Sequence, residues 1–260
     1  MDNPDWWGDG DDLLTDPDTQ KEEDETAKEC SKIECKKLPE TQLLELQILY
    51  NTPLLTKMGG SQDKVLKLIN SVMTHVQAYY CHSSLGSKVR LQQSGASGVK
   101  YYKEPDWIAS EDTLKRLAEI AETDLADSKA NLFVGLTFDD ETHGKNNNAG
   151  LAWGKAVCHN RDWSMSINEW DPDMTTFANT VAHEIGHNLG MEHDHEPNHK
   201  AKGCDKQGIM SYGGNWIKWS TCSRDDFTNH FRTMVKKNGF WCLPKAPSAC
   251  NPFAGSYSWF

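Results

Sequence analysis

The 260-residue sequence has no long apolar run and no excess of basic residues. None of its apolar stretches approaches the roughly 20 residues of a membrane-spanning helix, so we expect no membrane span. It contains 27 Lys and Arg against 38 Asp and Glu, a net charge of −11. A nucleic-acid partner would require a basic face, so this composition predicts that the protein binds no nucleic acid.

The N-terminus lacks the basic start and apolar core of a signal peptide. Residues 1–40 contain few aliphatic residues and hold 14 Asp and Glu against five Lys, which is most of the net negative charge. Such a composition is typical of a solvated, disordered leader. We expect an acidic leader or pro-segment remnant at 1–40, a catalytic domain at 41–245 and a tail at 246–260. We also expect that a secretory signal has been removed; the alternative is that this chain is a fragment.

Strand and helix patterns alternate along the folded domain. A strand is expected where an apolar run lies between turn residues, and a helix where apolar residues recur every three or four positions. The predicted strands are residues 43–50, 131–138, 150–158 and 165–168. The predicted helices start at Ser61 and after Ser110, cover 175–189, and run from a capping-box-like start at Ser223 and Asp226 to Gly239. This alternation indicates an α/β fold with a largely parallel sheet.

The segment 183–194 (HEIGHNLGMEHD) has the residue spacing of a metal site. On a helix, His183 and His187 stand one turn apart on the same face, so both imidazoles can bind one ion. Gly190 can adopt positive φ and turn the chain, which returns His193 as a third nitrogen ligand. Three neutral imidazoles leave one position open, as in a catalytic zinc site. Glu184 is then placed to contact a water on the ion.

The glycine and the third histidine make this signal specific. HExxH alone occurs by chance, but its extension by Gly190 and His193 on a predicted helix is rarely accidental. The alternative is a polar helix with incidental histidines. The remaining histidines, including His143, His159, His195 and His199, are expected at the surface. We therefore predict one zinc ion.

The segment 182–194 (AHEIGHNLGMEHD) resembles the motif of the metzincin metalloproteases, HExxHxxGxxH. Asp194, directly after the third histidine, resembles the adamalysin (reprolysin) branch, which includes snake-venom metalloproteases and ADAM proteins. Residues 208–212 (GIMSY) resemble the methionine turn of the family, and 219–223 resemble the segment before its last helix. Residues 150–158 resemble the edge strand that binds substrate. The resemblance extends from Gln42 to Pro244.

This resemblance implies the fold and the role of two further residues. It implies a metzincin-type α/β domain, with a twisted, mostly parallel sheet and an active-site helix followed by an irregular C-terminal subdomain. Met210 is expected in the methionine turn, as an apolar floor under the zinc. Asp194 is expected to be buried and hydrogen-bonded, with a structural role rather than that of a ligand.

Eight cysteines beside a protease-like site indicate oxidised pairs and an extracellular protein. Counting alone does not give the connectivity. The resemblance implies two pairs, Cys158–Cys242 and Cys204–Cys222. The resemblance leaves Cys30, Cys35, Cys81 and Cys250 unplaced. Among these, Cys81 is expected to pair with Cys30 or Cys35, which would join the leader to the domain.

Two other properties of the family are less well matched. Its calcium site is doubtful here, because Asp127 is one residue from the expected acid and Lys245 replaces an expected Asn, although Glu45 matches the first-strand acid. A leader cysteine that blocks the zinc is a minor alternative, because neither Cys30 nor Cys35 lies in a P-K-x-C-G-like context.

Together these features predict a secreted, monomeric zinc endopeptidase that cleaves internal peptide bonds of proteins. Zinc would activate a water, and Glu184 would act as the general base. The substrate would lie extended along the edge strand near residues 150–157. The alternatives are a secreted binding module whose catalysis is dispensable, a structural metalloprotein, or a metzincin of an astacin-like or matrix-type branch. Asp194 and the cysteine spacing favour the adamalysin branch.

Overall fold

The longest strand of the described sheet is β2 (Thr41–Asn51), in which Leu44, Leu46 and Ile48 are fully buried. β2 pairs in parallel with β3 (Lys88–Gln93), β4 (Val99–Tyr102) and β5 (Leu132–Thr137). The computed structural model describes residues 38–95, 98–104, 107–139, 148–194, 204, 207–212, 214–246 and 250, and the backbone of residues 13–14.

The strand order is β1-β6-β7-β5-β2-β3, and β4 pairs with β2 beside this path. β7 (Met165–Glu169) is parallel to β5, whereas β6 (Gly150–Trp153) is antiparallel to β7. A two-residue strand from the leader, β1 (Leu13–Leu14), pairs in parallel with β6. The mostly parallel α/β sheet that the sequence predicts is therefore confirmed.

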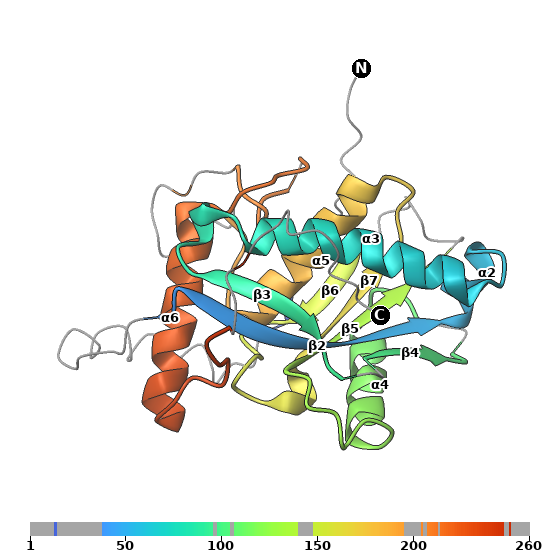
Figure 1. Ribbon diagram of the computed structural model, residues 1–260, viewed down its shortest axis with the longest axis horizontal. Coiled ribbons are helices and arrows are strands. Elements are labelled where there is room, and N and C mark those ends of the chain that lie inside the picture. Colours follow the sequence, from blue (N-terminus) through green and yellow to red (C-terminus); the bar gives the residue numbers. More distant parts are fainter. Residues whose placement is uncertain are drawn as a thin grey trace.

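Helices cover both faces of the sheet (Figure 1). α3 (Gln62–Tyr80) and α5 (Met174–Asn188) pack on one face, against apolar side chains that include Leu46 and Val134. α4 (Glu111–Glu122) packs on the other face, in a second cluster with Leu49 and Phe133. The remaining α-helices of the described chain are α2 (Thr52–Lys57) and α6 (Thr221–Asn238). None of the helices described is long and apolar enough to cross a membrane.

The edge strand is shorter than predicted. It ends at Trp153 rather than Cys158, because the following residues bind the end of α5 instead of a strand. The N–H groups of Lys155 and Val157 donate to the carbonyls of His187 at 2.8 Å and Asn188 at 3.0 Å. These bonds satisfy acceptors that a helix terminus otherwise leaves open.

The last helix begins earlier than predicted. Its N-cap is Ser220 rather than Ser223, because the Ser220 hydroxyl accepts the N–H of Ser223 at 2.9 Å. It ends as predicted at Gly239, which has a φ of 75°.

The described residues form three disulfides. Cys158–Cys242 and Cys204–Cys222 are the two pairs that the resemblance implied. The expected pairing of Cys81 with Cys30 or Cys35 is wrong, because Cys81 is bonded to Cys250. The tail returns beside β2, where Ala246 N–H donates to Thr41 O at 3.0 Å, and this path brings Cys250 to the end of α3. Cys30 and Cys35 lie outside the described residues.

Candidate metal centre

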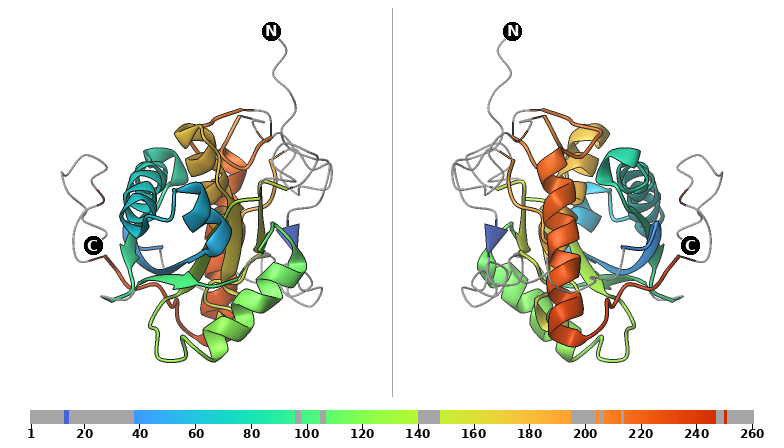
Figure 2. Two further views of the ribbon diagram at one scale, coloured as in Figure 1. Left: turned by 90° about the vertical axis from the view of Figure 1, so that its right-hand side faces the viewer. Right: turned by 90° about the vertical axis from the view of Figure 1, so that its left-hand side faces the viewer.

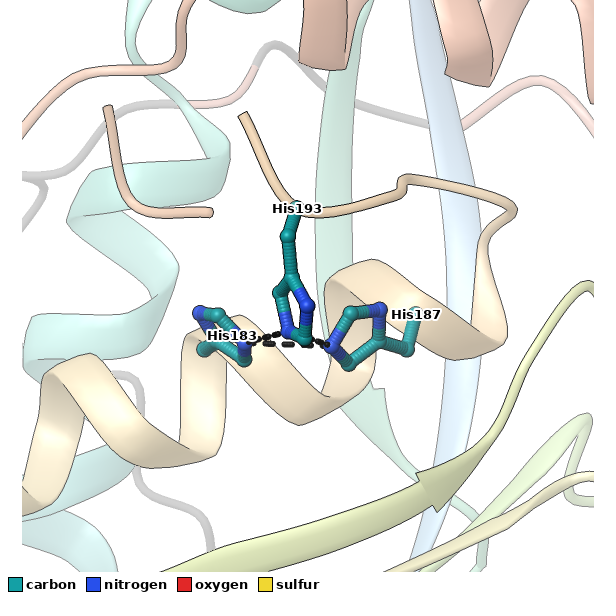
Figure 3. A group of neighbouring side chains, drawn as sticks. All are labelled: His183, His187 and His193. Carbon is teal, nitrogen blue, oxygen red and sulfur yellow. Dashed lines mark hydrogen bonds between the residues drawn. The ribbon is translucent and has the colours of Figure 1, made fainter. Parts of the chain in front are cut away.

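Helix α5 supplies the first two histidines from its buried C-terminal half. Its N-cap Asp173 accepts the N–H of Thr176 at 2.7 Å, and His183 and His187 follow on one face with exposed fractions of 2% and 0%. The helix ends at Asn188 with Leu189 as its C-cap, and Gly190 turns the chain with a φ of 93°. His193 then lies over the same helix face (Figure 3).

The turn at Gly190 requires a glycine for a second reason. A β-carbon there would lie 2.5 Å from Cβ of His230 on α6. His230 is fully buried, and this burial lowers its pKa to about 4, so the ring is neutral at physiological pH. Its Nε2 bonds to the carbonyl of Val157 at 2.8 Å. Gly190 and a neutral His230 therefore together hold the turn that brings back His193.

The three imidazoles converge through their Nε2 atoms. Nε2 of His187 lies 3.0 Å from Nε2 of His183 and 3.0 Å from that of His193, and the third separation is 3.2 Å. Nδ1 of His183 bonds to Ile209 O and Nδ1 of His187 to Met191 O, each at 2.8 Å. Because a carbonyl only accepts, both Nδ1 atoms carry the proton, and both Nε2 lone pairs face the common centre.

This arrangement fits a zinc ion. Lone pairs about 3 Å apart repel one another unless a cation lies between them. Tetrahedral zinc with Zn–N bonds of about 2.0–2.1 Å separates its nitrogen ligands by about 3.3 Å, close to the observed spacing. In the described part of the chain, His183, His187 and His193 are the group of His, Cys, Asp or Glu side chains arranged to hold a metal.

Glu184 lies between the helix and the edge strand. Its side chain is fully buried, and a β-carbon at Gly150 would lie 2.7 Å from its Oε1. Gly150 thus leaves the space that the carboxylate occupies. Burial and the Glu184 charge raise the pKa of Tyr80 well above its usual value, so the Tyr80 hydroxyl stays protonated and donates to Ala182 O at 2.8 Å.

Met210 packs under α5. It is fully buried, and its sulfur would lie 2.6 Å from a β-carbon at Gly186. The glycine inside the HEIGH segment therefore allows the methionine to approach the helix closely. The carbonyl of the preceding residue, Ile209, is the partner of His183. The methionine segment thus supports both the helix and the first histidine.

Asp194 faces the protein interior and is 3% exposed. Its carboxylate accepts the hydroxyls of Ser211 at 3.0 Å and Ser223 at 3.2 Å, and that of Ser220. Its N–H donates to Met210 O at 3.0 Å. Asp194 therefore joins the segment after His193 to the methionine segment and to the start of α6.

Tyr212 is a site residue that the sequence analysis missed. Its hydroxyl lies 3.3 Å from Nε2 of His193, and the two ring centroids are 4.8 Å apart. The sequence could have indicated it, because Tyr212 lies two residues after Met210, in the segment that was already expected under the metal. Of the other expected surface histidines, His159 is not in the group, and its Nε2 lies 3.3 Å from Lys237 Nζ. His143, His195 and His199 lie outside the described residues.

Comparison with known proteins gives a consistent result. The model of the Reprolysin (M12B) family zinc metalloprotease matches residues 42–247. The chain is 26% identical over 205 residues to snake venom metalloproteinase trimerelysin-2 of Protobothrops flavoviridis, a match that covers 78% of this chain and 96% of that protein. It is 29% identical over 216 residues to the zinc metalloproteinase-disintegrin-like brevilysin H2a of Gloydius brevicauda, covering 79% of this chain and 47% of that one. It therefore spans nearly all of the first relative and about half of the second.

Proposed function

Because the chain belongs to the reprolysin (M12B) family of zinc metalloproteases, we propose that it is an active endopeptidase that cleaves internal peptide bonds of proteins, with Glu184 as general base. The observation that carries this proposal is the convergence of three buried imidazole nitrogens within 3.0–3.2 Å, one residue away from a buried carboxylate. A structural zinc site would need a fourth protein ligand. In the described part of the chain the group has three members.

Each residue of the site has a defined task. His183, His187 and His193 would hold the zinc. When bound, zinc polarises the substrate carbonyl and lowers the pKa of a coordinated water. Glu184 accepts the proton of the attacking water and delivers it to the leaving amine nitrogen. Its position directly after His183 supports this role, because a general base must lie within hydrogen-bond reach of the proton that it accepts.

The substrate would bind along β6. The edge of this strand that does not face β7 offers main-chain N–H and C=O groups, which can pair with an extended peptide. Gly150 at the start of β6 adjoins the Glu184 carboxylate, so a peptide on this edge would pass beside the general base. The three disulfides among the described residues support an extracellular location, and we propose a monomer.

The test is the Glu184→Gln variant. The amide keeps the shape of the side chain but cannot accept the proton, so we expect full zinc content and a kcat lower by about 10²–10⁴-fold. Cleavage of quenched fluorescent peptides and zinc per chain are measured on the same samples. Glu119→Gln, at an exposed position on α4, is the matched control and should cleave like the wild type.

Retained turnover in Glu184→Gln would remove Glu184 as the base. A wild-type protein that holds one zinc but cleaves nothing would instead favour a binding module on a protease fold.

A further inference from the structure

Lys155, two residues after the end of β6, is buried and has an unusual backbone conformation. Its side chain is 3% exposed, and its φ of 58° lies in the left-handed region, which few residues other than glycine adopt. A buried lysine also loses its hydration. A strained backbone and a buried charge both cost free energy, so they persist only where the surrounding structure stabilises them. Such strained residues cluster at functional sites.

Lys155 contacts the chain at two places in the metal centre. Its N–H donates to the carbonyl of His187 at 2.8 Å, and its ammonium forms a 2.8 Å ion pair with Glu192, which directly precedes His193. Glu192 is itself 17% exposed in its side chain, and its N–H donates to a carboxylate oxygen of Asp226 on α6 at 3.1 Å. Lys155 thus binds the chain at the second histidine and next to the third.

We propose that Lys155 is a positioning residue of the zinc site, whose ion pair with Glu192 fixes His193 relative to His187. A charge-assisted hydrogen bond is stronger than a neutral one, and a buried pair is little screened by salt. Without it, the segment after Gly190 would depend on fewer contacts, and the spacing of the three Nε2 atoms would be less well defined. This inference rests on the zinc site of the proposed function.

The test measures zinc affinity independently of turnover. Zinc-loaded full-length protein is equilibrated with increasing concentrations of a chelator, and the zinc retained per chain is measured. We expect Lys155→Met and Glu192→Gln each to weaken zinc affinity by about 10–100-fold, the usual effect of removing a partner outside the ligands. The double variant should bind no more weakly than the weaker single variant, because both remove the same ion pair.

Two controls separate the ion pair from general packing. Lys155→Arg keeps the charge and should hold zinc nearly as well as the wild type. Lys115→Met breaks an exposed ion pair with Glu111, of side-chain exposure 59% and 49%, and should leave zinc affinity unchanged.

Wild-type zinc affinity in Lys155→Met and Glu192→Gln, or losses that add in the double variant, would overturn the proposal. If Lys155→Met does not fold, Glu192→Gln and Lys155→Arg decide. A wild type that binds no zinc would defeat the proposed function itself, which is a different result.

A second inference concerns the outer edge of β6, the edge that does not face β7. The leader strand β1, the short dark-blue arrow in Figure 2, occupies this edge. Leu13 lies opposite Ala152, and Leu14 lies opposite Trp153. The other edge of β6 is already paired with β7. β6 has four residues, so its outer edge accommodates one short partner strand.

From this pairing we infer that the leader competes with substrate for the β6 edge. The substrate edge of the proposed function and the edge bound by β1 are the same row of main-chain groups, so the two cannot bind together. Strand addition uses backbone hydrogen bonds. Neighbouring N–H groups of a strand point to opposite sides, so one of residues 13 and 14 has its N–H facing β6. Disruption of the pairing therefore depends on that backbone donor rather than on side-chain identity.

The test compares two double variants of the full chain. Leu13→Pro with Leu14→Pro removes both N–H groups and should lower KM several-fold, with kcat and zinc content unchanged. Leu13→Ala with Leu14→Ala retains the backbone donors and should keep a KM close to that of the wild type. An unchanged KM in the proline variant, or an equal fall in both variants, would overturn this inference. Absence of cleavage in all three zinc-loaded proteins would instead overturn the proposed function.

Discussion

A β-carbon at either of two glycines would collide with a residue of the metal centre. At Gly150 it would meet the Glu184 carboxylate, and at Gly186 the sulfur of Met210. Both distances are shorter than β-carbons tolerate, and both partners are buried with little room to move. At the scale of single residues, the position of Glu184 therefore depends on the lack of a side chain at Gly150. The packing of Met210 under α5 likewise depends on the lack of a side chain at Gly186.

Glu169, at the end of β7, gives a pH-dependent prediction. It is 6% exposed, and its burial, followed by the charge of Asp139, raises its pKa to about 7 from an ordinary value of about 4.3. Between these values the folded chain binds more protons than the unfolded chain, so this group lowers the free energy of unfolding as pH rises. Glu169→Gln removes this effect and should be more stable than the wild type at pH 8, by on the order of 2–3 kcal/mol.

Urea unfolding at pH 5 and pH 8 measures this difference. The gain of Glu169→Gln over the wild type should be small at pH 5 and larger at pH 8, and the Gln oxygen can still accept the N–H of Ala109. Glu122→Gln, exposed at the end of α4, is the matched control and should show no such change. An equal gain at both pH values would mean that Glu169 does not titrate in this range.

The parts of the metal centre that the sequence predicts lie close together in the chain. His183, Glu184, His187 and His193 fall within one helix and the turn after it, so helical periodicity and one glycine are sufficient to bring them together. Tyr212, Gly150 and Lys155 reach the centre from other segments. Their contribution depends on tertiary packing, which no local pattern contains.

At the scale of elements, the helices could be predicted from local signals, whereas several strands depend on partners that are distant in the sequence. The helices starting at Ser61 and Ser110 were predicted because their caps and apolar stripes are local signals. β3 and β4 were missed, because each is short, only partly buried and paired in parallel with the distant β2. The end of β6 was misplaced because its apolar continuation serves the C-terminus of α5, a partner that lies later in the sequence.

At the scale of the whole molecule, the Cys81–Cys250 disulfide closes the longest loop among the described pairs, with a separation of 169 residues. The buried amide of Gln77 lies beside it, donating to Val89 O at 3.0 Å while its oxygen accepts the N–H of Leu91 at 2.8 Å. α3, β3 and the tail are thereby joined. No local pattern indicated this pair, because the pair follows from the path of the tail past β2.

Removal of this disulfide should destabilise the fold without altering the metal centre. We expect Cys81→Ser with Cys250→Ser to lower the free energy of unfolding by about 4–5 kcal/mol, because the unfolded chain regains the entropy of a long loop. Zinc content and kcat at 25 °C should stay unchanged, since Gln77 keeps its bonds to β3 and the zinc-site histidines bind other segments. Urea unfolding and zinc analysis on the same preparation measure both effects.

The Cys204–Cys222 pair is the matched comparison, because its residues are 18 apart. Loop entropy predicts that its removal costs about 2 kcal/mol less than removal of Cys81–Cys250. Equal losses from the two double variants would show that local packing, rather than loop length, sets the contribution of each bond. α3 and α5 pack side by side on the sheet (Figure 1). A loss of zinc from the Cys81 and Cys250 variant would therefore show that attachment of the tail to α3 stabilises the histidines on α5.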